Sequence, residues 1–172
     1  MPTIDDFIRP KEWVSEFLVE LGKVVRRWGE ERYVPIRQEV DEDWEHHKLI
    51  TPLLKEVLVD LGVNAAFFPA EVGGSDMPEP NALSAIVCEE LARIDSGFAV
   101  ACICSIWGMI PILLEPHRNM ELLKEFGPKF CGENLYVGAM VMTEPASGAD
   151  VENLGRMRGK TIHTQAVLDG DE

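Results

Sequence analysis

The sequence predicts an α+β chain, in which helices fill residues 1–134 and β-structure begins at residue 135. Three observations support this division. Apolar residues recur at helical spacing through most of the first part. Residues 135–142 then form a near-continuous apolar run of strand length, as expected for a buried strand. Residues 161–168 alternate in polarity and lead into Asp169-Gly170, a strong hairpin-turn signal.

The composition is that of a soluble and acidic globular chain. Hydrophobic residues make up 46% and charged residues 27%, and the formal net charge is −14. Proteins that bind the nucleic-acid backbone need clustered Lys and Arg, so this charge argues against nucleic acid as a partner. The same charge disfavours adhesion to anionic membranes.

The four cysteines predict free thiols. Cys88, Cys102, Cys104 and Cys131 include no C-x-x-C pair, so neither a metal site nor a disulfide framework is expected. We interpret them as buried thiols in a reducing compartment. The N-terminus lacks the basic and apolar regions of a signal peptide, and a cytoplasmic protein is therefore expected.

The first helix is expected to begin at Pro10. Its apolar stripe comprises Trp13, Phe17, Leu18, Leu21, Val24, Val25 and Trp28. Neighbouring residues on a helix point apart, so we interpret His46 and His47 as solvated rather than metal-binding. Thr51-Pro52 predicts a further helix start, and Gly62 is expected to end that helix.

Another helix is predicted from Asn81. Its inward residues are Leu83, Ile86, Val87, Leu91 and Ile94, and its outward residues are Glu89, Glu90 and Arg93. The uncharged run 97–114 nearly reaches the roughly 20 residues that span a bilayer. It contains Gly97, Gly108 and Pro111 and lacks basic flanks, so we interpret it as a helix buried on all sides and expect no membrane span. A last short helix in 116–130 is expected to end at Gly127-Pro128.

The predicted strand 135–143 leads into a turn of small residues. Pro145, Gly148 and their neighbours would leave backbone N–H groups open to a closely approaching ligand, although such a turn is commonly only a turn. The Asp169-Gly170 turn lacks its returning strand, which would leave an unpaired edge. We therefore expect an unfinished β part, either because the chain is a fragment or because a second chain supplies the rest.

Five segments together resemble one enzyme family. The segment Thr143-Glu144-Pro145-Ala146-Ser147-Gly148-Ala149-Asp150-Val151 resembles the T-E-P-x-A-G-S-D-[VA] signature of the acyl-CoA dehydrogenase family. Residues 68–74 resemble its I-P-E-E-Y-G-G turn, 89–93 its E-E-L-A-R helix, and 108–112 its L-G-x-x-P-I segment. Residues 168–172 resemble the turn before its W-x-T-N strand. The resemblance covers the chain from about residue 11 to the end.

This resemblance implies an all-α helical N-terminal domain, residues 1–134, followed by an incomplete β-barrel domain, residues 135–172. It implies FAD-dependent α,β-dehydrogenation of an acyl-CoA thioester, in which a carboxylate takes the α-proton and hydride passes to flavin N5. The family's catalytic Glu lies in a C-terminal domain, so no residue of this chain is expected to be catalytic. Acyl-CoA, an electron-transferring flavoprotein and a second chain that completes the fold are the expected partners, in an oligomer.

The resemblance also assigns site residues. Those expected to contact FAD are Met140, Val141, Met142, Thr143, Gly148 and Ala149. The Thr143 hydroxyl would meet the polar edge of the isoalloxazine ring, and the Gly148 and Ala149 amides would meet the pyrophosphate. Residues expected at the acyl-CoA are Ala99, Val100, Ile103 and Ala149, with Trp107 on the same helix. Core packing of a strand is the alternative explanation for Met140 and Met142, and a buried helix would show the same apolar residues as an acyl pocket.

One departure from the family pattern leaves alternatives open. The A-G-S of the signature reads Ser147-Gly148-Ala149 here, so a side-chain hydrogen bond worth roughly 0.5–1.5 kcal/mol is lost. Ala149 favours a non-catalytic structural subunit of a heteromeric complex, whereas the retained Thr143 counts against it. Relatives that act as oxidases, hydroxylases or decarboxylating dehydrogenases also stay open, because their deciding residues would lie beyond residue 172.

Overall fold

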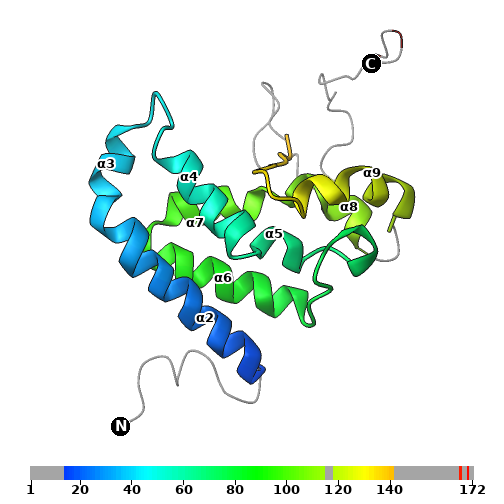
Figure 1. Ribbon diagram of the computed structural model, residues 1–172, viewed down its shortest axis with the longest axis horizontal. Coiled ribbons are helices and arrows are strands. Elements are labelled where there is room, and N and C mark those ends of the chain that lie inside the picture. Colours follow the sequence, from blue (N-terminus) through cyan, green and yellow to red (C-terminus); the bar gives the residue numbers. More distant parts are fainter. Residues whose placement is uncertain (1–13, 115–117, 142–166, 168–169, 171–172) are drawn as a thin grey trace, which may run out of the picture. The chain divides into compact units, whose positions relative to one another are not determined.

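The computed structural model describes residues 14–114, 118–141, 167 and 170. The chain divides into two compact units, residues 1–139 and 140–172, which are treated separately. The described part of the first unit is built from helices (Figure 1). Their order and bounds are α2 Glu16–Trp28, η2 Gly29–Tyr33, η3 Val34–Ile36, α3 Arg37–Glu42, α4 Ile50–Lys55, η4 Glu56–Asp60, α5 Val63–Ala66, η5 Ala70–Val72, α6 Pro80–Ile94, α7 Ser96–Cys104, η6 Trp107–Met109, α8 Ile110–Leu113 and α9 Met120–Phe130.

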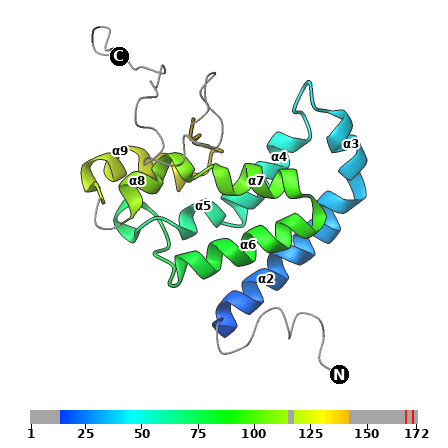
Figure 2. The same cartoon turned by 180° about the vertical axis from the view of Figure 1, so that it is seen from behind.

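Helix α6 is the centre of the first unit. It packs against α2 on one side and α7 on the other (Figures 1 and 2). All five residues predicted to face inward, Leu83, Ile86, Val87, Leu91 and Ile94, are buried. The prediction of this inner face from apolar periodicity is therefore confirmed.

The stripe of α2 is narrower than the sequence predicts. Leu18, Val25 and Trp28 are buried, but Phe17 and Val24 are about half exposed. The helix packs mainly against one neighbour, α6, so residues at the edges of the stripe stay in solvent. At the end of α2 the two helices come very close, because a Cβ at Gly29 would lie 2.9 Å from Cδ1 of Ile94.

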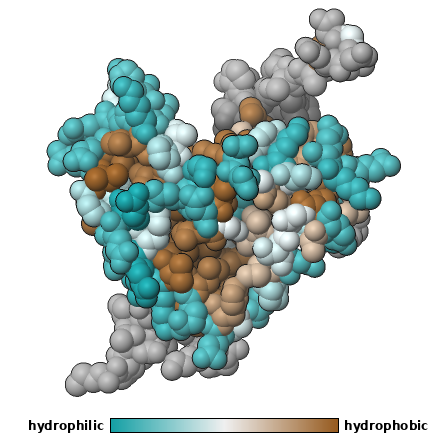
Figure 3. All heavy atoms as spheres, in the orientation of Figure 1, coloured by the Kyte–Doolittle hydropathy of each residue, from teal (hydrophilic) through white to brown (hydrophobic). Residues whose placement is uncertain are grey.

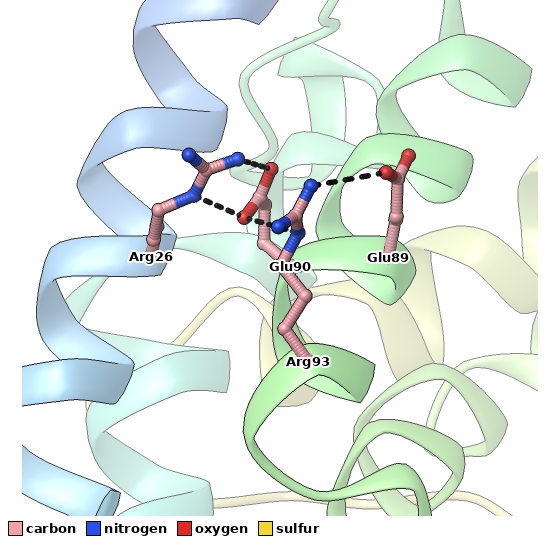
Figure 4. A network of polar contacts seen from close by, with 4 residues as sticks. All are labelled: Arg26, Glu89, Glu90 and Arg93. Carbon is pink, nitrogen blue, oxygen red and sulfur yellow. Dashed lines mark hydrogen bonds and ion pairs between the residues drawn. The ribbon is translucent and has the colours of Figure 1, made fainter. Parts of the chain in front are cut away.

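The prediction that Glu90 faces solvent is wrong. This carboxylate is buried and pairs with α2, where Arg26 Nε and Nη2 donate to its two oxygens at 2.7 and 2.9 Å (Figure 4). Arg93 Nε lies 3.4 Å from the same carboxylate, and Arg93 Nη2 lies 3.7 Å from Glu89. This bidentate, charge-assisted pair satisfies both oxygens of the Glu90 carboxylate, and the burial of the charge is therefore tolerated.

A second carboxylate links η4 to α2. Trp28 Nε1 donates to Glu56 Oε2 at 2.8 Å, and Arg32 Nη2 donates to Glu56 Oε1 at 2.7 Å. The hydrogen bond from Arg32 is the main cause that holds the pKa of Glu56 below its ordinary value. Gly62, the predicted end of this helical stretch, adopts φ +74°, the left-handed conformation that glycine permits.

The apolar run after α6 is broken rather than continuous. Ser96–Leu113 is long and apolar enough by length and composition to cross a membrane, with mean hydropathy 1.9, and 39% of it is buried. It consists of three pieces, α7, η6 and α8. The Ser105 hydroxyl lies 2.6 Å from the Cys102 carbonyl oxygen and competes with helix continuation where α7 ends. The prediction that this helix is buried on all sides is wrong, because Val100 is 58% exposed.

A separate small core lies around α8 and α9. It comprises Phe68, Val72, Ile106, Met109, Leu113, Leu123 and Phe130. Asn119 caps α9 by accepting from the amides of Glu121 and Leu122 at 3.1 and 3.2 Å. Contrary to expectation, α9 continues through Pro128 to Phe130. Proline here removes only one hydrogen bond in the last turns of the helix.

The strand predicted for residues 135–143 is not formed over 135–141, the portion that the structure describes. A strand needs a hydrogen-bonded neighbouring strand, and the described residues contain none. Leu135 packs instead on the main core of the unit, the larger cluster that includes Leu18, Val57, Leu91 and Phe98. Most of the second predicted strand and its turn, 161–166 and 168–169, lies outside the described residues.

Candidate functional site

A cavity of about 200 Å³ lies where the end of α5, the start of α6, the end of α7 and α8 meet. Its apolar wall is built by Phe67, Ile103, Ile106, Trp107 and Ile110. Drug-sized ligands occupy pockets of roughly 300–1,000 Å³. The cavity is therefore suited to a small apolar group or to one end of a longer ligand.

Polar side chains also contribute to the lining. Asn81 and Ser84 come from the first turns of α6, Asp76 from the preceding loop, and Arg118 from the segment before α9. Arg118 Nε donates to the Leu113 carbonyl at 3.1 Å, which ties this segment to the end of α8. An apolar wall with a few polar groups can orient a ligand that has an apolar body and a polar head.

The N-terminal end of α7 is held firmly, which fixes the helix that forms one wall. Asp95 caps α7, because its Oδ1 accepts from the Phe98 amide at 2.8 Å. Phe98 is buried and packs against Trp28 and Tyr33, with ring centroids 5.7 and 4.8 Å apart. Burial, and secondly the charge of Asp95, raise the pKa of Tyr33 to about 12.

The structure separates the predicted acyl-site residues of α7. Ile103 lines the cavity together with Trp107, whereas Ala99 is buried in the main core and Val100 points to solvent. Ala149 lies outside the described residues. The assignment of these residues to substrate stays a prediction.

The described FAD candidates belong to the second unit. Met140 is half-exposed and Val141 is 84% exposed, and an apolar ring system would cover such side chains favourably. Met142, Thr143, Gly148 and Ala149 lie outside the described residues. The exposed apolar pair at the start of the predicted flavin-lining segment is thus of a chemistry that fits FAD.

The four thiols are free, but only Cys102 is fully buried, contrary to the prediction for all four. Burial, and secondly the neighbouring Cys88, raise the pKa of Cys102 to about 12. Burial raises the pKa of Cys131 to about 11. Both thiols are therefore poor nucleophiles near neutral pH. Within the described residues, no group of three or more His, Cys, Asp or Glu side chains could hold a metal ion.

A smaller cavity of about 130 Å³ lies where α2, α5 and α6 meet. Its wall includes Leu21, Leu61, Val63, Leu83 and Val87. Figure 3 shows an apolar area between α2 and α6, bordered by hydrophilic residues. None of the predicted site residues lines this cavity.

Comparison with known proteins decides the family. The family model "Acyl-CoA dehydrogenase, N-terminal domain" matches residues 15–131. The chain belongs to the acyl-CoA dehydrogenase family. This agrees with the resemblance found in the five sequence segments, and it covers the helical unit that carries the cavity. The described fold is accordingly the helical N-terminal domain of that family.

Curated relatives support the same family. The chain is 31% identical to cyclohexane-1-carbonyl-CoA dehydrogenase of Syntrophus aciditrophicus, over 86% of this chain and 34% of the relative. It is 29% identical to cyclohex-1-ene-1-carbonyl-CoA dehydrogenase of Geobacter metallireducens, over 87% and 35%. Short-chain-specific acyl-CoA dehydrogenase of Megasphaera elsdenii is 27% identical, over 87% and 38%. The chain thus spans about a third of the length of these relatives. No solved structure matches it.

Sequence reasoning missed several residues of the cavity wall. Phe67, Met77 and Ser84 line it but lie in three segments remote from α7 in sequence. Residues 67 and 77 flank the loop that contains Gly73 and Gly74, and that loop was the only signal close to them. Apolar periodicity identifies faces of one helix, not cavities shared by several elements.

Proposed function

We propose that this chain forms the helical side of the acyl site of an FAD-dependent acyl-CoA dehydrogenase. The observation that carries the proposal is the apolar cavity at the end of α7, lined by the predicted residue Ile103 and by Trp107. The family membership supplies the class of reaction. FAD, when bound, would accept the β-hydrogen of the acyl thioester as hydride.

In this proposal the residues of the chain bind, orient and exclude water. Ile103, Ile106 and Trp107 would pack on the acyl group and keep solvent away from its α- and β-carbons. Removal of an α-proton by a carboxylate requires such a dry site, where hydrogen bonds stabilise the developing enolate. We assign the base and the remaining walls to the part of the enzyme that corresponds to the other two thirds of the relatives' length.

The substrate that we propose is a compact acyl-CoA with a short or cyclic acyl group. The cavity is small and apolar, at about 200 Å³. Of the relatives reported above, one is named for cyclohexane-1-carbonyl-CoA and another for cyclohex-1-ene-1-carbonyl-CoA. We further propose an electron-transferring flavoprotein as acceptor and a cytoplasmic location, which the four free thiols support.

Binding of acyl-CoA to the purified protein tests the proposal. Trp107 forms part of the wall, so its fluorescence should change when cyclohexane-1-carbonyl-CoA is added but not when free CoA is added. Trp107→Phe should remove the change, which distinguishes it from signals of the remaining tryptophans. Equal responses to the acyl thioester and to free CoA would contradict an acyl group in this cavity.

A further inference from the structure

Two buried polar side chains contact the segment that leads to the second unit. Asn64 on α5 and Ser105, just after α7, are fully buried. Asn64 Nδ2 donates to the Tyr136 carbonyl at 3.3 Å, and the Ser105 hydroxyl lies 3.2 Å from Asn64 Oδ1. Buried polar groups are tolerated when they are hydrogen-bonded, and these two satisfy each other and the backbone around them.

The backbone of the same segment is hydrogen-bonded directly to the end of α7. The Gly138 amide donates to the Ser105 carbonyl at 2.7 Å. Residues 136–138 are thereby held through both a side chain and the main chain. Tyr136 adds an edge-on ring contact with Phe130, at 4.9 Å between centroids. The junction of Asn64, Ser105, Tyr136 and Gly138 is called the 64/105 junction below.

Two glycines make this close approach possible. A Cβ at Gly138 would lie 3.0 Å from the Ser105 carbonyl oxygen and 3.3 Å from Cζ of Phe130. A Cβ at Gly108 would lie 3.2 Å from the Ala139 carbonyl oxygen. The two backbones therefore touch at two successive points, and side chains at either glycine would push them apart.

We propose that Asn64 and Ser105 are positioning residues for the flavin-lining segment. Through residues 136–138 they fix the point from which the chain enters Met140, the first predicted FAD contact. Ser105 lies between Ile103 and Trp107 in sequence, so the same junction holds the end of α7 that forms the acyl cavity. The inference rests on the proposed function, in which the chain belongs to an FAD-dependent enzyme and the cavity holds the acyl group, and on the predicted contact of Met140 with FAD.

Amide hydrogen exchange of the flavin-free full chain tests the junction itself. Ser105→Ala should accelerate exchange of the Gly138 amide more than that of the Val87 amide in α6, whereas Ser105→Thr, which keeps a hydroxyl, should restore protection. Ser96→Ala is the matched control, since Ser96 is exposed on α7. Equal acceleration at both amides in Ser105→Ala would overturn the inference, because the effect would then be general destabilisation.

Flavin affinity tests the positioning role, measured by fluorescence titration of the apoprotein in its complete assembly with FAD. Ser105→Ala and Gly138→Ala should each weaken FAD binding by about two- to tenfold, the effect of roughly one hydrogen bond, and Ser105→Thr should not. Wild-type affinity in both variants would overturn the inference while leaving the proposed function intact. Failure of the wild-type assembly to bind FAD would overturn the proposed function, and the inference with it.

Discussion

The two ends of α7 are built differently. At the N-terminal end Asp95 caps the first turn, and the ring of Phe98 stacks on Trp28 of α2. At the C-terminal end the helix stops at Ser105, and Ile103 and Trp107 border a cavity. An open apolar wall must keep its shape without a full set of neighbours. Buried polar contacts hold this end, where Ser105 contacts Asn64 and accepts from the Gly138 amide, whereas aromatic packing holds the other end.

The largest effect is expected from the packed end. Phe98→Ala should lower the free energy of unfolding by about 3–5 kcal/mol, because it removes a buried ring that contacts two aromatic neighbours. Val100→Ala, on the exposed side of the same helix, should change it by less than about 0.5 kcal/mol. Urea unfolding followed by circular dichroism measures both. Similar losses in the two variants would show that α7 has no firmly packed end.

The next effect concerns the ion network of Arg26, Glu90 and Arg93 between α2 and α6. Arg26→Ala should cost about 2–3 kcal/mol, somewhat below the usual figure for a broken buried pair, because Arg93 still contacts Glu90. Lys23→Ala breaks an exposed pair with Glu20 and should cost less than about 1 kcal/mol. The double variant Arg26→Met/Glu90→Leu should recover most of the loss. If it is less stable than Arg26→Ala, the buried charge is not the cause.

A binding effect without a stability effect is expected at the open end. Ile103→Trp should fill part of the cavity and weaken binding of cyclohexane-1-carbonyl-CoA at least about tenfold, or about 1.4 kcal/mol. Titration calorimetry gives the affinity, and the midpoint of thermal unfolding should stay within a few degrees. Val34→Trp is the control, because Val34 is exposed and does not line the cavity. An unchanged affinity in Ile103→Trp would contradict the placement of the acyl group in this cavity.

The smallest effect depends on pH at the packed end. The pKa of Tyr33 is raised from 10.0 to about 12, so its stabilising contribution is complete below pH 10 and is lost as pH rises toward 12. Tyr33→Phe lacks this titration. Between pH 8 and pH 11 the wild type should lose about 1 kcal/mol more of unfolding free energy than the variant. Parallel losses in the two proteins would exclude a buried, protonated phenol.

The sequence predicts well those features that depend on one helix and one neighbour. The inner face of α6 and the glycine turn at Gly62 are examples, since periodicity and backbone freedom are local properties. Glu90 could not be predicted to be buried, because its burial depends on Arg26, which is remote in sequence. Of the residues expected at the acyl group, only Ile103 and Trp107 line the cavity, because its other walls come from separate segments.

The buried thiol of Cys102 can report local opening of α7. Cys102 is buried against the core, whereas Cys104, two positions along, is partly exposed. A thiol reagent can modify Cys104 from the native state, but it reaches Cys102 only when α7 separates from its neighbours. The labelling rate of Cys102 relative to that of Cys104 therefore reports how often α7 separates from its neighbours. A bound acyl group that stabilises the cavity should lower this ratio.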